Sequence, residues 1–324
     1  MKVLVLGGAG YIGSHMCKFL SQQGHQVVVF DNLSTGHASA VKWGEFIEGD
    51  ILNITDCEQL FEQQGPFDLV MHFCAKSLVG ESVKKPAEYY KNNVLGTVNV
   101  LDTMLKTGHK SLVFSSTAAV FGIPNVDLIN EEQPRLPINP YGQSKKMVED
   151  ILKDYHQAYG LKSVCLRYFN ACGADPELEI GERHEPETHL IPNILKSVNN
   201  ESNLKVFGND YPTVDGTCVR DYIHINDLAA AHMKAGDYLA THDGAYAFNL
   251  GNGNGFSVMD IIKASVVVVG HDIPFTVEDR REGDPAVLVA DASYANKELN
   301  WQPKYTKIED IIVTAWQWHQ NEKF

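Results

Sequence analysis

The first 170 residues alternate short apolar runs with longer segments of helical periodicity. The apolar runs contain few polar residues, which is typical of parallel strands that are buried on both faces. They lie at 3–6, 27–30, 46–48, 69–73, 112–115 and 164–167. Between them the pattern predicts helices at 12–23, 56–64, 86–106 and 140–159. Repeated βα units with right-handed crossovers predict an α/β fold with a doubly wound, Rossmann-type parallel sheet.

This alternation stops near residue 170, where glycine, proline and asparagine become frequent. They cluster at 173–176, 208–212 and 251–255, and such clusters predict loops. We therefore expect two domains, with the sheet in residues 1–170 and a smaller C-terminal α/β region in 171–324. Within about 221–250, the parts at 221–237 and 246–250 are expected to return to the main domain.

The charge balance narrows the class of partner. The chain has 27 Lys and Arg against 41 Asp and Glu, which gives a formal net charge of −14. A binder of nucleic acid or of an anionic membrane needs an excess of basic residues, so we expect neither as a partner. No arginine occurs before Arg135. Any anion bound by the N-terminal part must therefore be held without guanidinium groups from that part.

The spacing of the cysteines and histidines predicts a reducing compartment. It does not predict a metal centre. The six cysteines form no Cys-x-x-Cys pair, no apolar run approaches the roughly 20 residues that span a bilayer, and the short apolar start runs into glycines. We therefore expect free thiols and a cytoplasmic location. His184 and His189 share an acidic stretch, which we interpret as a solvated loop, and no metal site is predicted.

A glycine-rich segment, GGAGYIG at 7–13, directly follows the first predicted strand. Such a turn lets the backbone approach a pyrophosphate, whose charge then lies at a helix N-terminus. Asp31 ends the second strand, where a carboxylate accepts hydrogen bonds from the ribose of NAD and repels the 2′-phosphate of NADP. Asp50 ends the third strand, where it could bind the adenine amino group or simply cap the next helix. The cofactor predicted from these positions is NAD.

Tyr141 and Lys145 stand four residues apart at the start of a predicted helix, and therefore on one face of it. A phenol has a pKa of about 10 and is a poor base at neutral pH. A neighbouring ammonium and the positive nicotinamide ring both favour the phenolate. The fifth strand ends in Ser115–Thr117, where a hydroxyl can meet the tyrosine and a substrate oxygen. A lone Tyr-x-x-x-Lys pair is usually a solvated helix face, so this prediction depends on the NAD loop and the strand-end hydroxyls.

These motifs resemble those of the extended short-chain dehydrogenase/reductases, and further motifs resemble the UDP-glucose 4-epimerase family within them. The further motifs are GES at 80–82, RYFN at 167–170, FGNDYPT at 207–213, DGT at 215–217, VRDYIH at 219–224 and RREGD at 280–284. The resemblance covers essentially the whole chain. It implies an NAD-dependent homodimeric enzyme that interconverts UDP-glucose and UDP-galactose through a 4-keto intermediate, and it implies that the region after 170 mainly binds the UDP-sugar.

The resemblance also implies residue roles. Tyr141 would be the acid/base, Thr117 would hydrogen-bond the 4-hydroxyl, and Lys145 would hold the cofactor ribose and the phenolate. NAD would be bound by Gly7, Gly10, Tyr11, Ile12, Gly13, Asp31, Asn32, Asp50, Ile51, Phe73, Ala75, Ser77, Asn92, Tyr141, Lys145 and Phe169. The UDP-sugar would be bound by Thr117, Asn170, His189, Leu190, Phe207, Arg220, Arg281, Asp284 and Leu288. The helices around 86–106 and 140–159 would form the dimer contact.

Three positions depart from a common form of the family. Thr117 replaces a serine and keeps the hydroxyl, and His189 stands where an asparagine often contacts the sugar side. Leu288 stands where some members have a large tyrosine that closes the pocket. Because leucine is smaller, N-acetylated UDP-hexoses are expected to fit as well.

Individual residues bear on whether the chain has one of the other activities found on the same fold. A nucleotide-sugar 4,6-dehydratase typically needs Asp-Glu after the strand-end threonine, whereas Ala118 and Ala119 follow here. A UDP-uronate 4-epimerase stays an alternative, because the sequence does not place the residues at the pocket end. A non-catalytic NAD sensor would usually lack the Tyr–Lys pair that this chain keeps.

Overall fold

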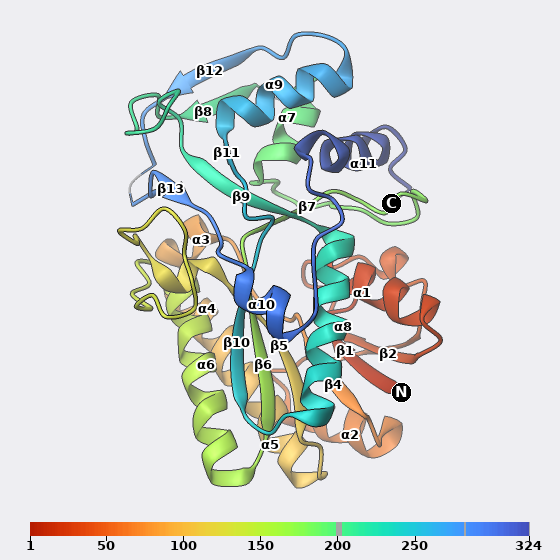
Figure 1. Ribbon diagram of the computed structural model, residues 1–324. Coiled ribbons are helices and arrows are strands. Elements are labelled where there is room, and N and C mark those ends of the chain that lie inside the picture. The colour runs from red at the N-terminus through yellow and green to blue at the C-terminus, as the bar shows by residue number, and fades with distance from the viewer. Residues whose placement is uncertain (199–202, 282, 324) are drawn as a thin grey trace.

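The main sheet of the protein has seven parallel strands. A computed structural model describes residues 1–198, 203–281 and 283–323. The strands stand in the order β3-β2-β1-β4-β5-β6-β10 (Figure 1). Their bounds are β1 Lys2–Leu6, β2 Gln26–Asp31, β3 Glu45–Glu48, β4 Leu69–His72, β5 Ser111–Thr117, β6 Lys162–Tyr168 and β10 Ala245–Leu250. The first six are the predicted strands, so the doubly wound sheet is confirmed. The order reverses between β1 and β4, and ligands of such sheets bind beyond the strand ends at this point.

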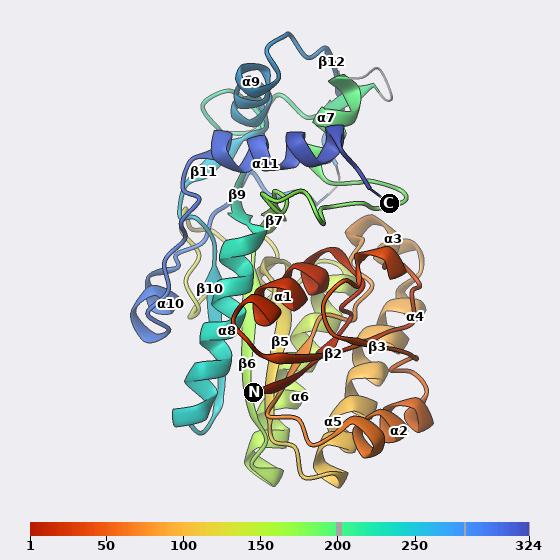
Figure 2. The same cartoon turned by 90° about the vertical axis from the view of Figure 1, so that its right-hand side faces the viewer.

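Helices cover both faces of the main sheet (Figure 2). One face carries α1 Tyr11–Gln22 and α8 Ile225–Thr241, and the other carries α2 Ile54–Gln64, α5 Gly96–Lys106 and α6 Pro140–Tyr159. Val3 and Val5 of β1 pack towards α1 and α8, while Leu4 and Leu6 pack towards the opposite helices. Alternate side chains therefore enter two different cores, which explains why the strands show no polar face.

The smaller region lies above the main sheet in Figure 1. Its strand β9 Val219–His224 pairs with β7 Asn170–Cys172, β11 Gly255–Ser257 and β13 Val287–Leu288, and β8 Leu204–Phe207 pairs with β12 Phe275–Glu278. Helices α7 Leu190–Val198, α9 Val258–Val269 and α11 Ile308–Gln320 enclose its core, and α10 Ser293–Glu298 packs back near β10. Within 221–250, α8 and β10 lie on the main sheet. Residues 221–224 do not, because β10 already occupies the edge beside β6 and β9 has its hydrogen-bonding partners in the small sheet.

The helix predicted at 86–106 is not continuous. The structure has α3 Val79–Lys84, α4 Pro86–Tyr89, a π-helical turn at Tyr90–Leu95, and then α5. Such turns often occur at functional sites, because they shift the side chains that follow around the helix axis. Two short 3₁₀ turns, Ala38–Ala40 and Ala118–Phe121, complete the secondary structure of the described residues.

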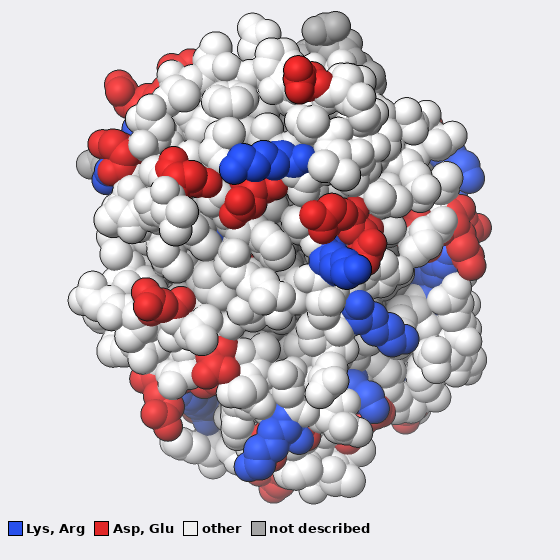
Figure 3. All heavy atoms as spheres, turned by 45° about the horizontal axis from the view of Figure 1, so that its top comes forward, with Lys and Arg blue, Asp and Glu red and all other residues white. Residues whose placement is uncertain are grey.

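On the face seen in Figure 3, Lys and Arg side chains are interspersed with Asp and Glu side chains. Among the helices of the described residues, none has the length and hydropathy to cross a membrane.

Candidate active site

The glycine-rich turn between β1 and α1 leaves no room for side chains at two positions. Gly7 has φ +84°, and a Cβ there would lie 2.7 Å from the backbone nitrogen of Cys74. A Cβ on Gly13 would lie 2.1 Å from the Gly7 carbonyl oxygen. At the N-terminus of α1, Gly10 supplies no side-chain cap. The turn therefore presents backbone amides and the positive end of a helix dipole, which fits the pyrophosphate of a dinucleotide.

The ends of β2 and β3 bring two carboxylates beside this turn. Asp31 is buried and accepts hydrogen bonds from the backbone nitrogens of Ala9 at 3.0 Å and Leu33 at 2.8 Å. Burial raises the pKa of Asp31, and the backbone donors partly offset this. Asn32 donates to Asp50 at 3.1 Å. Asp31 therefore closes the glycine-rich turn. It also has the position, at the end of β2, that is predicted for a carboxylate binding the cofactor ribose.

The other predicted NAD residues follow the ends of β3, β4 and β6 or lie in the π-helical turn. Ile51 is only 3% exposed, and Phe73 follows β4 with its ring 4.8 Å from that of His232. Ala75 and Ser77 occupy the loop between β4 and α3, Asn92 lies in the π-helical turn, and Phe169 is buried between β6 and β7.

Asn93 is a residue that the sequence analysis did not single out. Its side chain accepts from the Lys76 backbone nitrogen at 2.9 Å and donates to the Lys76 carbonyl at 3.0 Å. It also donates to Ser144 Oγ on α6 at 3.0 Å. Asn93 thereby ties the loop after β4 to the helix that carries Tyr141. The sequence signal was the Asn-Asn pair at 92–93, inside the helix predicted at 86–106.

The predicted catalytic side chains meet at the end of β5. Helix α6 begins at Pro140, and Asn139 caps it by accepting from the Gly142 nitrogen at 2.8 Å. The first turn of α6 thus places Tyr141 against Thr117, the last residue of β5. Burial raises the pKa of Tyr141, and a hydrogen bond from the Thr117 hydroxyl acts in the opposite direction. The hydroxyl stabilises the phenolate, so the pair can hold and release a proton.

Lys145 lies one turn further along α6 and is buried. Its Nζ donates to the Ser115 carbonyl at 2.7 Å and lies 4.6 Å from the centre of the Phe114 ring. Burial lowers the pKa of Lys145 to about 7. A phenolate at Tyr141 would favour the charged ammonium at this position.

A buried ion pair connects α6 with the neighbouring strands β5 and β6. Glu149 of α6 accepts from Arg167 Nε at 2.9 Å and Nη2 at 2.7 Å, from Arg135 at 2.9 Å and from Ser116 Oγ at 2.6 Å. Arg135 and Arg167 are therefore held by a buried carboxylate of α6. The sequence pattern offered no signal for this contact, because its members are far apart in the chain.

The predicted substrate residues gather in the smaller region. Arg220 of β9 forms an ion pair with Asp284, and the Arg281 guanidinium lies 4.1 Å from the centre of the Phe207 ring. Leu288 of β13 stands opposite Arg220 in the strand register. Asn170 donates to the Asp221 carbonyl at 2.8 Å. The structure thus brings two arginines and the β13 leucine to one side of β9.

Leu288 also links the two halves of the site. It packs against a buried cluster that contains Ala118 and Phe121 from the turn after Thr117, and Phe169. Leu190, the first residue of α7, packs on the separate core of the smaller region.

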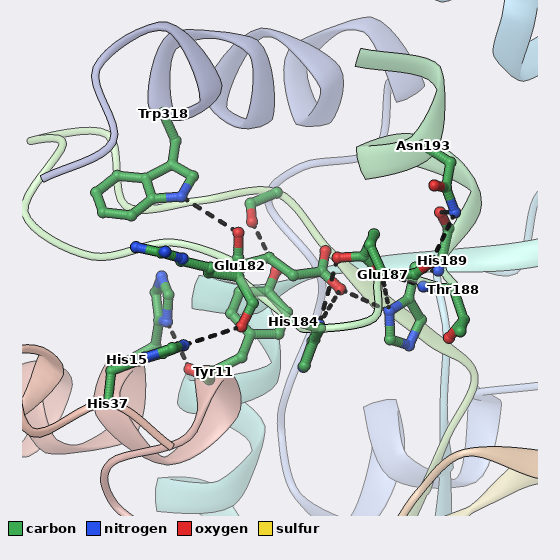
Figure 4. Close-up of polar contacts among 12 residues, drawn as sticks. Tyr11, His15, His37, Glu182, His184, Glu187, Thr188, His189, Asn193 and Trp318 are labelled. Atoms are coloured by element: carbon green, nitrogen blue, oxygen red, sulfur yellow. Dashed lines mark hydrogen bonds and ion pairs between the residues drawn. The ribbon is translucent and has the colours of Figure 1, made fainter. Parts of the chain in front are cut away.

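His184 and His189 were expected in a solvated loop, and the His189 side chain is indeed 43% exposed, whereas that of His184 is 26% exposed. The Nδ1 of His189 lies 2.8 Å from Glu187 and 3.0 Å from Glu182, and His184 faces the same two carboxylates (Figure 4). Burial disfavours protonation here, but the carboxylates raise the pKa of His184 to about 9 and that of His189 to about 10. The sequence pattern did not show that the chain between β7 and α7 folds these four side chains onto one another.

Comparisons with known proteins agree with this geometry. The model of the NAD dependent epimerase/dehydratase family matches residues 3–251. A UDP-glucose 4-epimerase of Halalkalibacterium halodurans is 49% identical over 321 residues, which cover 99% of this chain and 96% of that protein. The structure of a UDP-glucose 4-epimerase from Brucella ovis in complex with NAD has 47% identity and a TM-score of 0.94, over 98% of this chain and 97% of that one. A UDP-Glc/GlcNAc 4-epimerase from Campylobacter jejuni has 40% identity and a TM-score of 0.86, over 99% of both chains. Sequence, fold and the geometry at the strand ends agree that the chain belongs to the NAD dependent epimerase/dehydratase family.

Proposed function

We propose that this protein is a UDP-hexose 4-epimerase that interconverts UDP-glucose and UDP-galactose through a 4-keto sugar. The observation that carries the proposal is the placement of Tyr141, in the first turn of α6, beside Thr117 at the end of β5, with the buried Lys145 one turn away. This pair stands beside the switch point of the sheet, where the glycine-rich turn and Asp31 fit NAD. The relatives that carry the name UDP-glucose 4-epimerase support the same activity.

The residues act on one oxygen of the substrate. NAD, when bound, supplies the acceptor and then the donor of the hydride at C4. Thr117 would hold the sugar O4 against Tyr141, and Tyr141 takes its proton. The Lys145 ammonium stabilises the Tyr141 phenolate that must be present before this proton is taken, and Tyr141 is a neutral phenol once it holds the proton. After the 4-keto sugar has turned over within the site, Tyr141 returns the proton to O4 of the epimer.

The diphosphate of the substrate requires positive charge, and the smaller region supplies it. Arginine binds phosphate oxygens through two parallel N–H groups. Asp284 holds Arg220, and the Phe207 ring supports Arg281. Both guanidinium groups are therefore oriented before a ligand arrives, which lowers the entropic cost of binding.

A product assay tests the activity directly. Purified protein is incubated with UDP-galactose without added NAD, and the formation of UDP-glucose is followed by chromatography. We expect turnover with no net consumption of cofactor, because the hydride returns to the substrate. The absence of any C4 epimer, with NAD bound and with NAD added, would refute the proposal.

We also propose that the pocket accepts N-acetylated UDP-hexoses. Leu288 is partly buried and packs beside Phe169 and the turn that follows Thr117. A side chain larger than leucine at this position would extend towards the sugar side of the site. The Campylobacter jejuni protein, named as an epimerase of both UDP-Glc and UDP-GlcNAc, supports this extension.

Leu288→Tyr is expected to separate the two substrates. The larger ring should lower kcat/KM for UDP-N-acetylglucosamine by about tenfold or more, because pocket volume alone discriminates by factors of this order. The value for UDP-glucose should change by less than about threefold. Leu288→Met, which conserves volume, is the matched control and should leave both unchanged. Equal loss on both substrates in the tyrosine variant would contradict the assignment of Leu288 to the sugar pocket.

We further propose a cytoplasmic homodimer with a contact built from α5 and α6 and the π-helical turn. Leu95 is 48% exposed and Met147 is 37% exposed, so both are available as apolar contacts. The cysteines are all free thiols, which fits a reducing compartment. Sedimentation should give twice the mass of the 36.0 kDa chain, and a Leu95→Asp/Met147→Asp double variant should sediment as a monomer. A dimer that persists in the double variant would place the contact elsewhere.

A further inference from the structure

The loop before α7 brings four potential metal ligands together. Glu182, His184, Glu187 and His189 each direct one ligand atom inwards, and these atoms all lie within 4.8 Å of one another (Figure 4). Two carboxylates and two imidazoles are the ligand types that zinc takes in proteins. The four residues occur within eight positions of the chain, so one loop supplies the whole set.

The two His184 distances fit a tetrahedral ion, whereas His189 Nδ1 lies at hydrogen-bond distance, 2.8 and 3.0 Å, from the same two carboxylates. Zinc bonds of about 2.1 Å place the atoms of a tetrahedral ligand set about 3.4 Å apart. His184 Nδ1 lies 3.4 Å from Glu182 Oε1 and 3.5 Å from Glu187 Oε2. These separations are longer than an ordinary N–H···O hydrogen bond. The same nitrogen has no solvent contact and no hydrogen-bond partner, so it is a buried donor aimed at two anions.

A second cluster of carboxylates in the same region differs from the Glu182–Glu187 pair because it surrounds a lysine. Asp175, Glu177 and Glu179 surround the Lys18 ammonium at 2.7, 2.6 and 2.7 Å. That cluster already contains its cation. In the described part of the chain, Glu182 and Glu187 have ion pairs with the two histidines and with no lysine or arginine. One divalent cation would neutralise both carboxylates while the imidazoles stay neutral.

The ligands are held in place by their surroundings. The backbone nitrogens of Thr188 and His189 both donate to Glu187 Oε1 at 2.8 Å, which leaves Oε2 facing His184. Trp318 of α11 donates to the Glu182 carbonyl at 3.3 Å, and Asn193 of α7 donates to the His189 carbonyl at 2.8 Å. Contacts of this kind orient metal ligands and raise affinity.

We propose that Glu182, His184, Glu187 and His189 bind one zinc ion, which fixes this loop between the two halves of the molecule. A cavity of about 270 Å³ lined by Glu182, His184 and Glu187 provides a path of entry. On one side, the His184 ring lies 6.2 Å from the ring of Tyr11 in the cofactor turn. On the other side, His189 directly precedes Leu190 at the start of α7. The role of the ion is structural, because its four protein ligands leave no open position.

Zinc itself is the probe for the test. The NAD-loaded full-length protein is treated with a chelator, exchanged into metal-free buffer and titrated with zinc chloride in a calorimeter. We expect one zinc per chain, and an affinity at least about a hundredfold weaker in His184→Gln, because even losses outside the ligand shell cost 10- to 100-fold. His271→Gln is the matched control, since His271 is exposed and remote in sequence, and it should bind zinc as the parent does.

Two results would overturn the proposal. One is a parent protein that takes up no stoichiometric zinc, which would leave a cluster of protonated histidines paired with carboxylates. The other is a His184→Gln variant that binds zinc as tightly as the parent, which would place the ion elsewhere. If the variant fails to fold, the parent loaded with cobalt decides. The intense visible absorption of tetrahedral cobalt supports the site, whereas the weak spectrum of octahedral cobalt refutes it.

Discussion

Tyr141→Phe is expected to lower kcat by about 10²- to 10⁴-fold, the usual contribution of a positioned acid/base. The substitution removes one oxygen and keeps the ring, so the packing of the first turn of α6 is preserved. The proton of the sugar O4 then has no acceptor beside Thr117. The measurement is the rate of UDP-glucose formation from UDP-galactose, with KM and bound NAD determined in parallel.

The matched control for this prediction is Tyr155→Phe on the same helix. The Tyr155 hydroxyl donates to Asp102 at 2.6 Å and lies away from Thr117 and Lys145. Its loss should leave kcat within about twofold of the parent. A Tyr141→Phe protein that turns over at the parental rate would remove Tyr141 from the reaction and with it the proposed mechanism.

Glu149→Gln is expected to lower the free energy of unfolding by about 3–5 kcal/mol, the cost of leaving a buried charge unpaired. Glutamine has nearly the shape of glutamate, so no cavity is created. Arg167 is only 3% exposed and would lose the negative charge that accepts its two hydrogen bonds from Nε and Nη2. Urea denaturation at neutral pH measures the difference. Asp150→Asn is the control, because Asp150 also contacts Arg135 but is partly exposed, and pairs of that kind contribute at most about 1 kcal/mol.

The same ion pair predicts a pH dependence. Burial alone would raise the pKa of Glu149, but the hydrogen bonds and charge of Arg167 hold it below its usual value. A carboxylate with a lowered pKa in the folded state stabilises the protein above its unfolded pKa of about 4.3. This contribution is lost as the pH falls through the folded pKa. The difference in stability between parent and Glu149→Gln should therefore be constant above about pH 5 and shrink in more acidic solution, and a difference that grows with acid would contradict the assignment.

Local patterns predicted the parts of the site that lie at the ends of strands. Gly7 and Gly13 come after the first strand and Asp31 ends the second, so the length of one βα unit sets their spacing. Tyr141 and Lys145 lie on one helix turn, so their proximity is also a local property. Thr117 could be placed because parallel strands end at a common edge, and the residues after β5 necessarily face that edge.

Contacts between distant segments could not be predicted in this way. Asn93 was passed over because its partner Ser144 lies 51 residues further along the chain. The helix predicted at 86–106 has apolar spacing typical of a single helix, yet tertiary contacts of the π-helical turn interrupt it. The loop at 182–189 has a polar composition that favours exposure, and only its folding against α7 and α11 turns those side chains inwards.

The sequence by itself determined the doubly wound sheet and the choice of NAD, and it identified Tyr141 and Lys145 as the candidates for proton transfer. These features depend on hydrophobic periodicity, on backbone freedom at glycine, and on the chemistry of neighbouring side chains, all of which act over a few residues. Only the tertiary structure decided that β9 leaves the main sheet, that Glu149 holds Arg167 and Arg135 beneath α6, and that His184 and His189 converge on two carboxylates. Those outcomes depend on which strand edges, charged side chains and cavities are still without a partner when the rest of the chain has packed. No local pattern contains that information.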